Sequence, residues 1–200
     1  MERCTNFTYE LDGNLYINLT SRCTNDCTFC VRNDKAEYFG HKLWLAREPS
    51  PAEVLERIPA DIGRYKEYVF CGFGEPTMRL DALVEIGKAL KARGATVRLN
   101  TNGQAELICG RDVSAELAQA VDKINVSLND SDAADYVKLC RPRWGEKAFY
   151  ALQEFAKHCA ARGINTWFSV VDVIGEEKIA ACRRIAETCG VALKVRPYIK

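Results

Sequence analysis

The chain has 200 residues, a formal net charge of +1 and 48% hydrophobic residues. This length is typical of one domain of roughly 100–200 residues, and the apolar content excludes a largely disordered chain. The 28 basic and 27 acidic residues nearly cancel, so the charge gives no sign of a polyanionic partner. We expect a single domain over residues 1–200 with a substantial core.

Localisation is predicted from what the sequence lacks. No apolar run approaches the roughly 18 residues that span a bilayer, and the first residues, MERCTNFTYELDG, hold no apolar core of a secretory signal. We therefore expect a cytoplasmic protein without membrane contact. In that reducing compartment, ten cysteines indicate metal binding or catalysis rather than a disulfide framework.

Short apolar runs rich in β-branched and aromatic residues predict six strands. They cover Leu15–Leu19, Tyr68–Phe73, Thr96–Leu99, Lys123–Leu128, Trp167–Ile174 and Ala192–Val195. Helical periodicity separates them, over Pro51–Tyr65, Leu80–Arg93, Val113–Val121, Glu146–Arg162 and Glu176–Cys189. This alternation is typical of parallel βα units.

The number of units predicts the architecture. A closed barrel of eight βα units takes about 250 residues, whereas this chain has room for six units and a long first loop. We expect an α/β fold, namely a partial (β/α)6 TIM-like barrel of parallel strands that is open on one side. An open doubly wound sheet is the alternative. In both, chemistry is expected at the carboxyl ends of the strands.

Three cysteines follow the first predicted strand in the segment TSRCTNDCTFCVRND, a loop at about residues 20–35. The thiolates of Cys23, Cys27 and Cys30 can hold three irons of a cubane cluster and leave the fourth iron open, because such clusters usually have four cysteine ligands. The alternative is a non-catalytic module that binds zinc or a structural cluster. A structural zinc site normally has four protein ligands, and no fourth ligand stands nearby in the sequence.

The cysteine loop resembles the CxxxCxΦC signature of radical S-adenosylmethionine (SAM) enzymes, with Phe29 as the aromatic residue. The resemblance implies a 4Fe–4S cluster on the three cysteines, with SAM on the remaining iron and Phe29 beside the adenine. It also implies one-electron cleavage of SAM to methionine and a 5′-deoxyadenosyl radical, which takes a hydrogen atom from a substrate. An electron donor such as flavodoxin or ferredoxin would reduce the cluster.

The segment CGFGEPT at the end of the second strand supports this resemblance. It is similar to the family's GGEP motif, whose backbone binds the amino group of SAM. Gly72, Gly74 and Glu75 match the motif, and Phe73 replaces a glycine. Glycine allows a backbone to approach a ligand closely, although an ordinary strand-to-helix turn would use the same residues.

Three later strand ends resemble the family's remaining SAM contacts. LNTNG would contact the ribose or carboxylate of SAM, VSLND the ribose, and SVVDVIGEE the adenine. The residues implied are Asn100, Asn102, Ser127, Asn129 and Val173. The alternatives are a turn at Asn102, a helix cap at Asp130 and plain core packing at Val173.

The strings NLTSRCTNDCTFCVRND and FCGFGEPT resemble a short subgroup, the radical SAM proteins linked to TatD-type nucleases. An open barrel suits a large substrate such as a peptide, protein or nucleic acid, whereas a small molecule would need further closure of the mouth. The sequence offers no second cysteine cluster, so no auxiliary iron–sulfur centre is expected.

Two further segments have open roles. Cys71, close to the expected SAM site, is either a packing residue, a radical donor or a substrate contact. Cys140 begins CRPRWGE, in which Arg141, Arg143 and Trp144 form a basic and aromatic spot. This spot either binds a phosphate, a carboxylate or a stacked base, or Trp144 packs on the barrel beside a solvated helix start.

Overall fold

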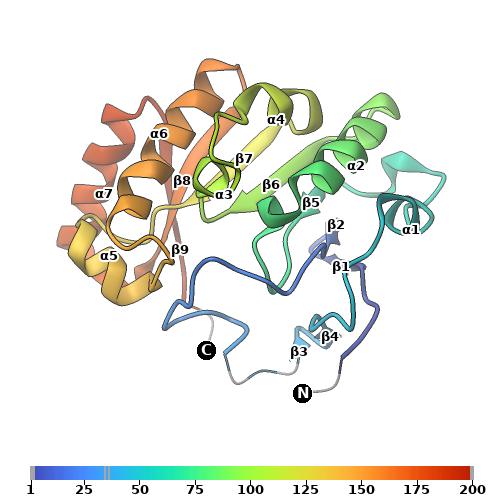
Figure 1. Cartoon of the computed structure of the whole chain (residues 1–200), viewed down its shortest axis with the longest axis horizontal. Coiled ribbons are helices and arrows are strands. Elements are labelled where there is room, and N and C mark those ends of the chain that lie inside the picture. The colour runs from blue at the N-terminus through green and yellow to red at the C-terminus, as the bar shows by residue number, and fades with distance from the viewer. Residues whose placement is uncertain (1–2, 34, 36, 199–200) are drawn as a thin grey trace.

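A seven-stranded sheet forms the centre of the domain, in the order β1-β2-β5-β6-β7-β8-β9 (Figure 1). The computed structural model describes residues 3–33, 35 and 37–198. Its six parallel strands are β2 (Asn14–Ile17), β5 (Tyr68–Phe70), β6 (Val97–Thr101), β7 (Lys123–Ser127), β8 (Asn165–Val171) and β9 (Ala192–Arg196). The parallel strands follow one another in chain order without the reversal that defines a doubly wound sheet. The predicted open, partial barrel is confirmed.

Four helices cover one face of the sheet (Figure 1). They are α2 (Leu80–Ala92), α4 (Ser114–Ala120), α6 (Lys147–Ala161) and α7 (Glu176–Thr188). Their apolar sides and the strands enclose a core in which Leu83, Phe155 and Phe168 are fully buried. No helix in the described part of the chain has the length and apolarity needed to cross a membrane.

The predicted helix Pro51–Tyr65 is wrong in extent. Helix α1 (Pro51–Leu55) begins with a capping box between Ser50 and Glu53 and is only five residues long. Pro59 explains the early end, because proline lacks the backbone N–H and disfavours a helical conformation in the residue before it. A separate 3-10 turn, η1 (Ile62–Arg64), follows.

Several short elements were not predicted. They are β1 (Thr8–Leu11), β3 (Glu37–Tyr38), β4 (His41–Lys42), α3 (Ala105–Cys109), α5 (Ala133–Cys140), η2 (Pro76–Arg79) and η3 (Asp172–Ile174). Strand β1 pairs antiparallel with β2 through an Asp12–Gly13 turn in which both residues have positive φ, as expected of a tight hairpin. Helix α5 is capped by Asp132, which accepts from two backbone N–H groups, and not by Asp130.

Candidate active site

The carboxyl ends of the six parallel strands meet at a cavity of about 250 Å³. It contains most of the predicted site residues: Cys23, Cys27, Phe29, Cys30, Cys71, Gly72, Phe73, Asn102, Ser127 and Asn129. Its other lining residues include Tyr9, Tyr38, Leu43, Val171, Arg196 and Tyr198. Each strand from β2 to β9 therefore contributes at least one lining residue, from its end or from the loop that follows.

The cysteine loop between β2 and β3 is folded around one guanidinium group. Arg32, whose side chain is 15% exposed, donates to the carbonyl oxygens of Ser21 (3.4 Å), Asn25 (3.1 Å) and Phe73 (3.2 Å). The side-chain amide of Asn33 donates to the Cys27 carbonyl at 2.9 Å. These bonds hold the loop in the curved form that turns its cysteines towards the cavity. Asp34, in the predicted loop, lies outside the described residues.

The three cysteine sulfurs do not form a compact group of the kind that holds a single metal ion. Among the described residues, the one set of three potential ligands whose donor atoms all lie within 4.8 Å of one another is Glu106, Asp112 and His158. The sulfurs of Cys23, Cys27 and Cys30 are therefore spread more widely. Two thiolates on one tetrahedral zinc ion lie only roughly 3.8 Å apart, given Zn–S bonds of about 2.3 Å. A cubane, in which each thiolate binds a different iron, allows the wider separation of three cysteines that line one cavity.

The three thiols lie in a poorly solvated environment. Burial raises the pKa of Cys23 to about 12 and also raises the pKa of Cys30. A hydrogen bond with the Cys140 thiol, together with burial, raises the pKa of Cys27. Metal ligation requires thiolates, so loading these cysteines with a metal centre releases protons.

Glu75 organises the wall behind the cavity. Its carboxylate is 3% exposed and accepts hydrogen bonds from the Thr77 N–H (3.0 Å), the Thr77 and Thr101 hydroxyls (2.8 Å each) and the Asn102 N–H (2.7 Å). Burial raises the pKa of Glu75, and these hydrogen bonds oppose the shift. The carboxylate thus joins the end of β5 to the end of β6. Glu75 lies outside the cavity lining, so it acts on a ligand only through its neighbours.

Two glycines of the same segment allow close packing against the cysteine loop. A Cβ atom on Gly74 would lie 2.3 Å from the Thr20 carbonyl oxygen and 2.5 Å from that of Arg22. A Cβ atom on Gly72 would lie 2.1 Å from Oδ1 of Asn18. Gly72 lines the cavity, whereas Gly74 does not. Both positions require glycine because the segment after β5 lies in close contact with the segment after β2.

Helix α5 supports the cysteine loop from the other side. Backbone bonds run from the Asp26 N–H to the Cys140 carbonyl (3.1 Å), and from the Thr28 N–H to the Leu139 carbonyl (2.9 Å). The Arg143 N–H donates to the Thr24 carbonyl at 2.8 Å. Backbone hydrogen bonds to the end of α5 and to the segment after it therefore hold the loop in place.

A buried polar network lies beneath this contact. The Gln104 side-chain amide donates to Asn25 Oδ1 (2.7 Å) and to the Tyr136 hydroxyl (3.1 Å). The Asn102 amide donates to the Thr24 hydroxyl at 2.8 Å. These bonds join the cysteine loop, the turn after β6 and α5, which are far apart in sequence. Sequence reasoning missed Arg32, Gln104 and Tyr136, and no local pattern marks them.

The Arg141–Trp144 segment, which follows α5, helps to hold the cysteine loop. Trp144 packs against the hydrophobic core, as one of the two predicted alternatives stated, and the Arg143 guanidinium lies 5.5 Å from the centre of its ring. The Cys140 side chain is fully buried beside Cys27.

Asn129 carries a buried acceptor without a partner. Its backbone has φ +62°, uncommon for any residue but glycine. Its side-chain Nδ2 donates to Cys140 Sγ at 3.4 Å, while Oδ1 has no partner in the described residues although the residue is 4% exposed. An unpaired buried acceptor costs about 1–3 kcal/mol. Because Asn129 lines the cavity beside Ser127, a bound ligand with a donor group would satisfy it.

Part of the cavity lining is aromatic and carries one guanidinium group. Tyr9, Tyr38 and Tyr198 line it together with Arg196, whose backbone pairs with β8 and whose guanidinium lies close enough to Tyr38 and Cys71 to favour their charged forms. Cys71 also lines the cavity, and its carbonyl oxygen accepts from the Tyr9 hydroxyl at 3.4 Å. Burial raises the pKa of the Cys71 thiol, and the Asn100 side chain hydrogen-bonds to it.

Besides Gly74 and Glu75, two further predicted SAM contacts, Asn100 and Val173, do not line the cavity. Asn100 accepts from the Arg98 guanidinium at 3.0 Å and supports Cys71 from behind. Val173 is 45% exposed and lines a separate shallow groove. Strand β8 ends at Val171, and the 3-10 turn η3 carries Val173 away from the cavity, so Val171 is the lining residue from this strand end.

The hydrogen bonds of Arg32 predict that this side chain holds the cysteine loop in its conformation. Arg32→Gln is expected to destabilise the loop by about 2 kcal/mol, the value of a charged hydrogen bond, and to lower the iron retained after anaerobic reconstitution and gel filtration. Arg93→Gln is the matched control, because Arg93 also donates to carbonyl groups, those of Pro59 and Ala60, but away from the cavity. Equal iron retention in both variants would contradict this role.

Comparison with known proteins assigns the chain to a family. Residues 17–187 match the profile of the Radical SAM superfamily. GTP 3′,8-cyclase from Corynebacterium glutamicum is 30% identical over 136 residues, covering 64% of this chain and 33% of that enzyme. The chain thus spans about a third of the length of the curated relatives it matches.

Solved structures show the same fold. SuiB of Streptococcus suis bound to S-adenosylmethionine superimposes with a TM-score of 0.68 at 17% identity, covering 92% of this chain and 40% of SuiB. A radical SAM methyltransferase from Sphaerobacter thermophilus gives 0.65 at 14% identity, covering 95% of this chain and 68% of that one. The family match, the shared fold and the three-cysteine cavity agree, and the chain belongs to the radical SAM superfamily, an enzyme family that uses a 4Fe–4S cluster and S-adenosylmethionine.

Proposed function

We propose that this chain cleaves SAM reductively at the strand-end cavity, with Cys23, Cys27 and Cys30 holding the 4Fe–4S cluster. The observation that carries the proposal is the position of these cysteines, which come from one loop and line a cavity formed by all six parallel strands. The bound cluster supplies one electron and an open iron to SAM. The protein's own contribution is to hold the loop, through Arg32 and α5, and to shape the rest of the cavity.

The SAM contacts in this proposal are the cavity-lining polar and aromatic groups. Phe29 lies against the adenine, the backbone at Gly72 and Phe73 receives the amino group, and Asn102, Ser127 and Asn129 bind the ribose and carboxylate. Gly74, Glu75 and Asn100 support this lining from behind, and Val171 takes the apolar role predicted for Val173. The unpaired Oδ1 of Asn129 supports this assignment.

The part of the cavity lined by Tyr9, Tyr38, Tyr198 and Arg196 receives the substrate in this proposal. Cys71, which lies beside Tyr9, either contacts the substrate or returns a hydrogen atom to it. The substrate is a peptide, a protein, a nucleic acid or a small molecule, and a donor such as flavodoxin or ferredoxin supplies the electron. The resemblance to TatD-linked radical SAM proteins belongs to this proposal. So does a cytoplasmic location, which the ten free cysteines support.

The proposal is tested by anaerobic reconstitution with iron and sulfide, followed by dithionite and SAM. Formation of 5′-deoxyadenosine by the protein and its absence without dithionite are expected. A site that takes up zinc alone, binds no SAM and forms no product would overturn the proposal in favour of a metal-binding module.

Asn129→Gly provides a second test, aimed at SAM binding. Glycine keeps the left-handed backbone at this position and removes only the amide. We expect about tenfold weaker SAM binding, equivalent to about 1.4 kcal/mol, with an unchanged iron content. Anaerobic calorimetry with the cluster-loaded protein measures it. Asn165→Gly, at the exposed start of β8, is the control, and equal SAM affinities in the two variants would contradict the assignment.

A further inference from the structure

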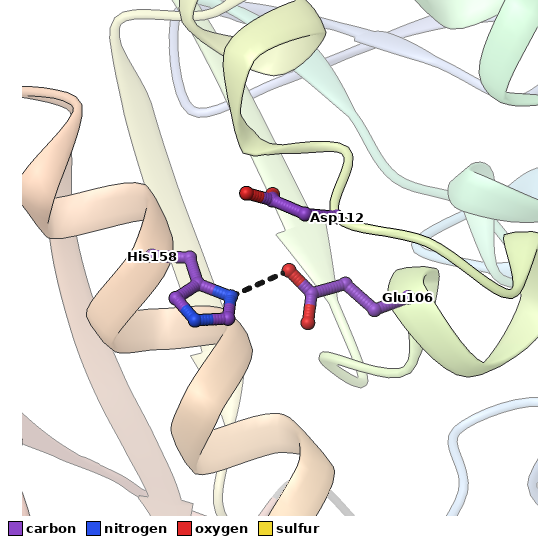
Figure 2. A group of neighbouring side chains, drawn as sticks. All are labelled: Glu106, Asp112 and His158. Atoms are coloured by element: carbon purple, nitrogen blue, oxygen red, sulfur yellow. Dashed lines mark hydrogen bonds and ion pairs between the residues drawn. The ribbon is translucent and has the colours of Figure 1, made fainter.

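A second group of metal-binding side chains lies on the helical side of the domain. Figure 2 shows Glu106 of α3, Asp112 of the α3–α4 connection and His158 of α6 directed towards one another. One donor atom from each lies within 4.8 Å of those of the other two. His158 Nδ1 and Glu106 Oε1 are hydrogen-bonded at 2.8 Å. Three separate segments thus bring an imidazole and two carboxylates together.

The presence of an imidazole distinguishes this group from an ordinary acidic surface. His158 is one of only two histidines in the chain. Burial raises the pKa of Glu106, the adjoining Asp112 carboxylate adds to the shift, and His158 opposes it. Backbone and side-chain bonds from Ser114 lower the pKa of Asp112. Two carboxylates therefore share a small space in which a cation would lower their repulsion.

We propose that Glu106, Asp112 and His158 bind a divalent transition metal ion, and that zinc fits this donor set. Zinc accepts imidazole nitrogen and carboxylate oxygen at about 2.0–2.2 Å, with water completing four ligands. Donors on one such ion lie roughly 3.4 Å apart. Rotation of side chains closes the remaining gap, because the side chains of Asp112 and His158 are 46% and 43% exposed.

One neighbouring cation competes for the site. Arg162 Nη2 lies 3.9 Å from Asp112 Oδ2, and Arg162 Nε donates to the Ser114 hydroxyl at 3.3 Å. The metal must therefore displace this guanidinium from Asp112 and the proton shared by His158 and Glu106. The site is consequently weaker than a preformed structural zinc site, and the Arg162 side chain is free to turn to solvent when the metal binds.

The position of the site gives it a structural consequence. Helix α3 follows directly after the turn that carries Asn102 and Gln104, and it packs on α6. A bound ion would join α3 to α6 and fix the turn behind the cavity wall. The site is separate from the cysteine loop, so its test does not depend on SAM chemistry.

The two histidines make the test direct. The cluster-loaded protein, whose cysteines are occupied, is labelled with ¹⁵N in its histidine rings and titrated anaerobically with Zn²⁺. The ring signals of His158 are expected to shift and saturate at one zinc per chain, while those of His41 stay in place as an internal control. Glu106→Gln and Asp112→Asn are each expected to weaken binding at least tenfold. Glu146→Gln, at the exposed start of the same helix α6, is expected to bind zinc as the unaltered chain does.

Unmoved His158 signals in excess zinc would overturn the proposal. Unchanged affinity in both Glu106→Gln and Asp112→Asn would also do so, because an imidazole alone would then account for the binding. Loss of the cluster absorbance with unmoved His158 signals would place zinc at the cysteines and equally contradict the site.

Discussion

Joint replacement of Cys23, Cys27 and Cys30 by alanine is expected to remove the iron–sulfur absorbance and to abolish 5′-deoxyadenosine formation. Without three thiolates the cluster has no attachment to the loop, so the loss should be complete rather than partial. Iron and sulfide analysis, the visible spectrum and product assay measure it. Folding is checked by circular dichroism, since the loop lies outside the core strands and helices.

Other cysteines of the same chain provide the control for this variant. Cys109, Cys182 and Cys189 lie on or beside α3 and α7, away from the cavity. Their joint replacement by alanine is expected to leave four irons of the cluster type and full product formation, at a modest cost in stability. Retention of a complete cluster after loss of the loop cysteines would contradict the assignment of the ligands.

Glu75→Gln is expected to have the second largest effect. Glu75 Oε1 accepts three of the four hydrogen bonds and Oε2 accepts the Asn102 N–H. The amide oxygen of glutamine can keep the Thr77 and Thr101 bonds, but its NH₂ group then faces the Asn102 N–H. One buried donor loses its partner, which costs about 1–3 kcal/mol. Because Asn102 lines the cavity, SAM affinity should fall together with the free energy of unfolding.

Denaturant unfolding of the cluster-free protein and SAM titration of the loaded protein measure these two effects. Glu177→Gln, at the exposed first turn of α7, is the control and should change neither quantity. Normal stability and normal SAM affinity in Glu75→Gln would show that the carboxylate does not organise this wall.

Long elements with a clear period could be predicted from the sequence. The strands and the helices α2, α4, α6 and α7 follow the expected order, with helix ends within about one residue of the prediction. The prediction of a helix over Pro51–Tyr65 is wrong because the helical spacing of apolar residues continues past Pro59, whereas a regular helix does not continue through a proline. Helix α5, with eight residues, is stabilised by packing and by its Asp132 cap, and so short a segment carries little period of its own.

The site shows the same limit. The sequence marks the cysteines, CGFGEPT and the strand ends, because their spacing is local. It cannot reveal that the Glu75 carboxylate is taken up by bonds from Thr101 and Asn102, because this depends on where the end of the neighbouring strand lies. Nor can it show that Val171 rather than Val173 lines the cavity. In a continuing strand both side chains would point to the same face, but the 3-10 turn η3 ends the strand before Val173.

The most direct measurement for the central claim is electron paramagnetic resonance of the dithionite-reduced cluster, recorded without SAM and with SAM. If three cysteines leave one iron open to SAM, adding SAM should change the spectrum of the reduced cluster, and Asn129→Gly should need about tenfold more SAM for the same change. An identical spectrum with and without saturating SAM would contradict the account, because a cluster with four protein ligands has no iron on which SAM can bind.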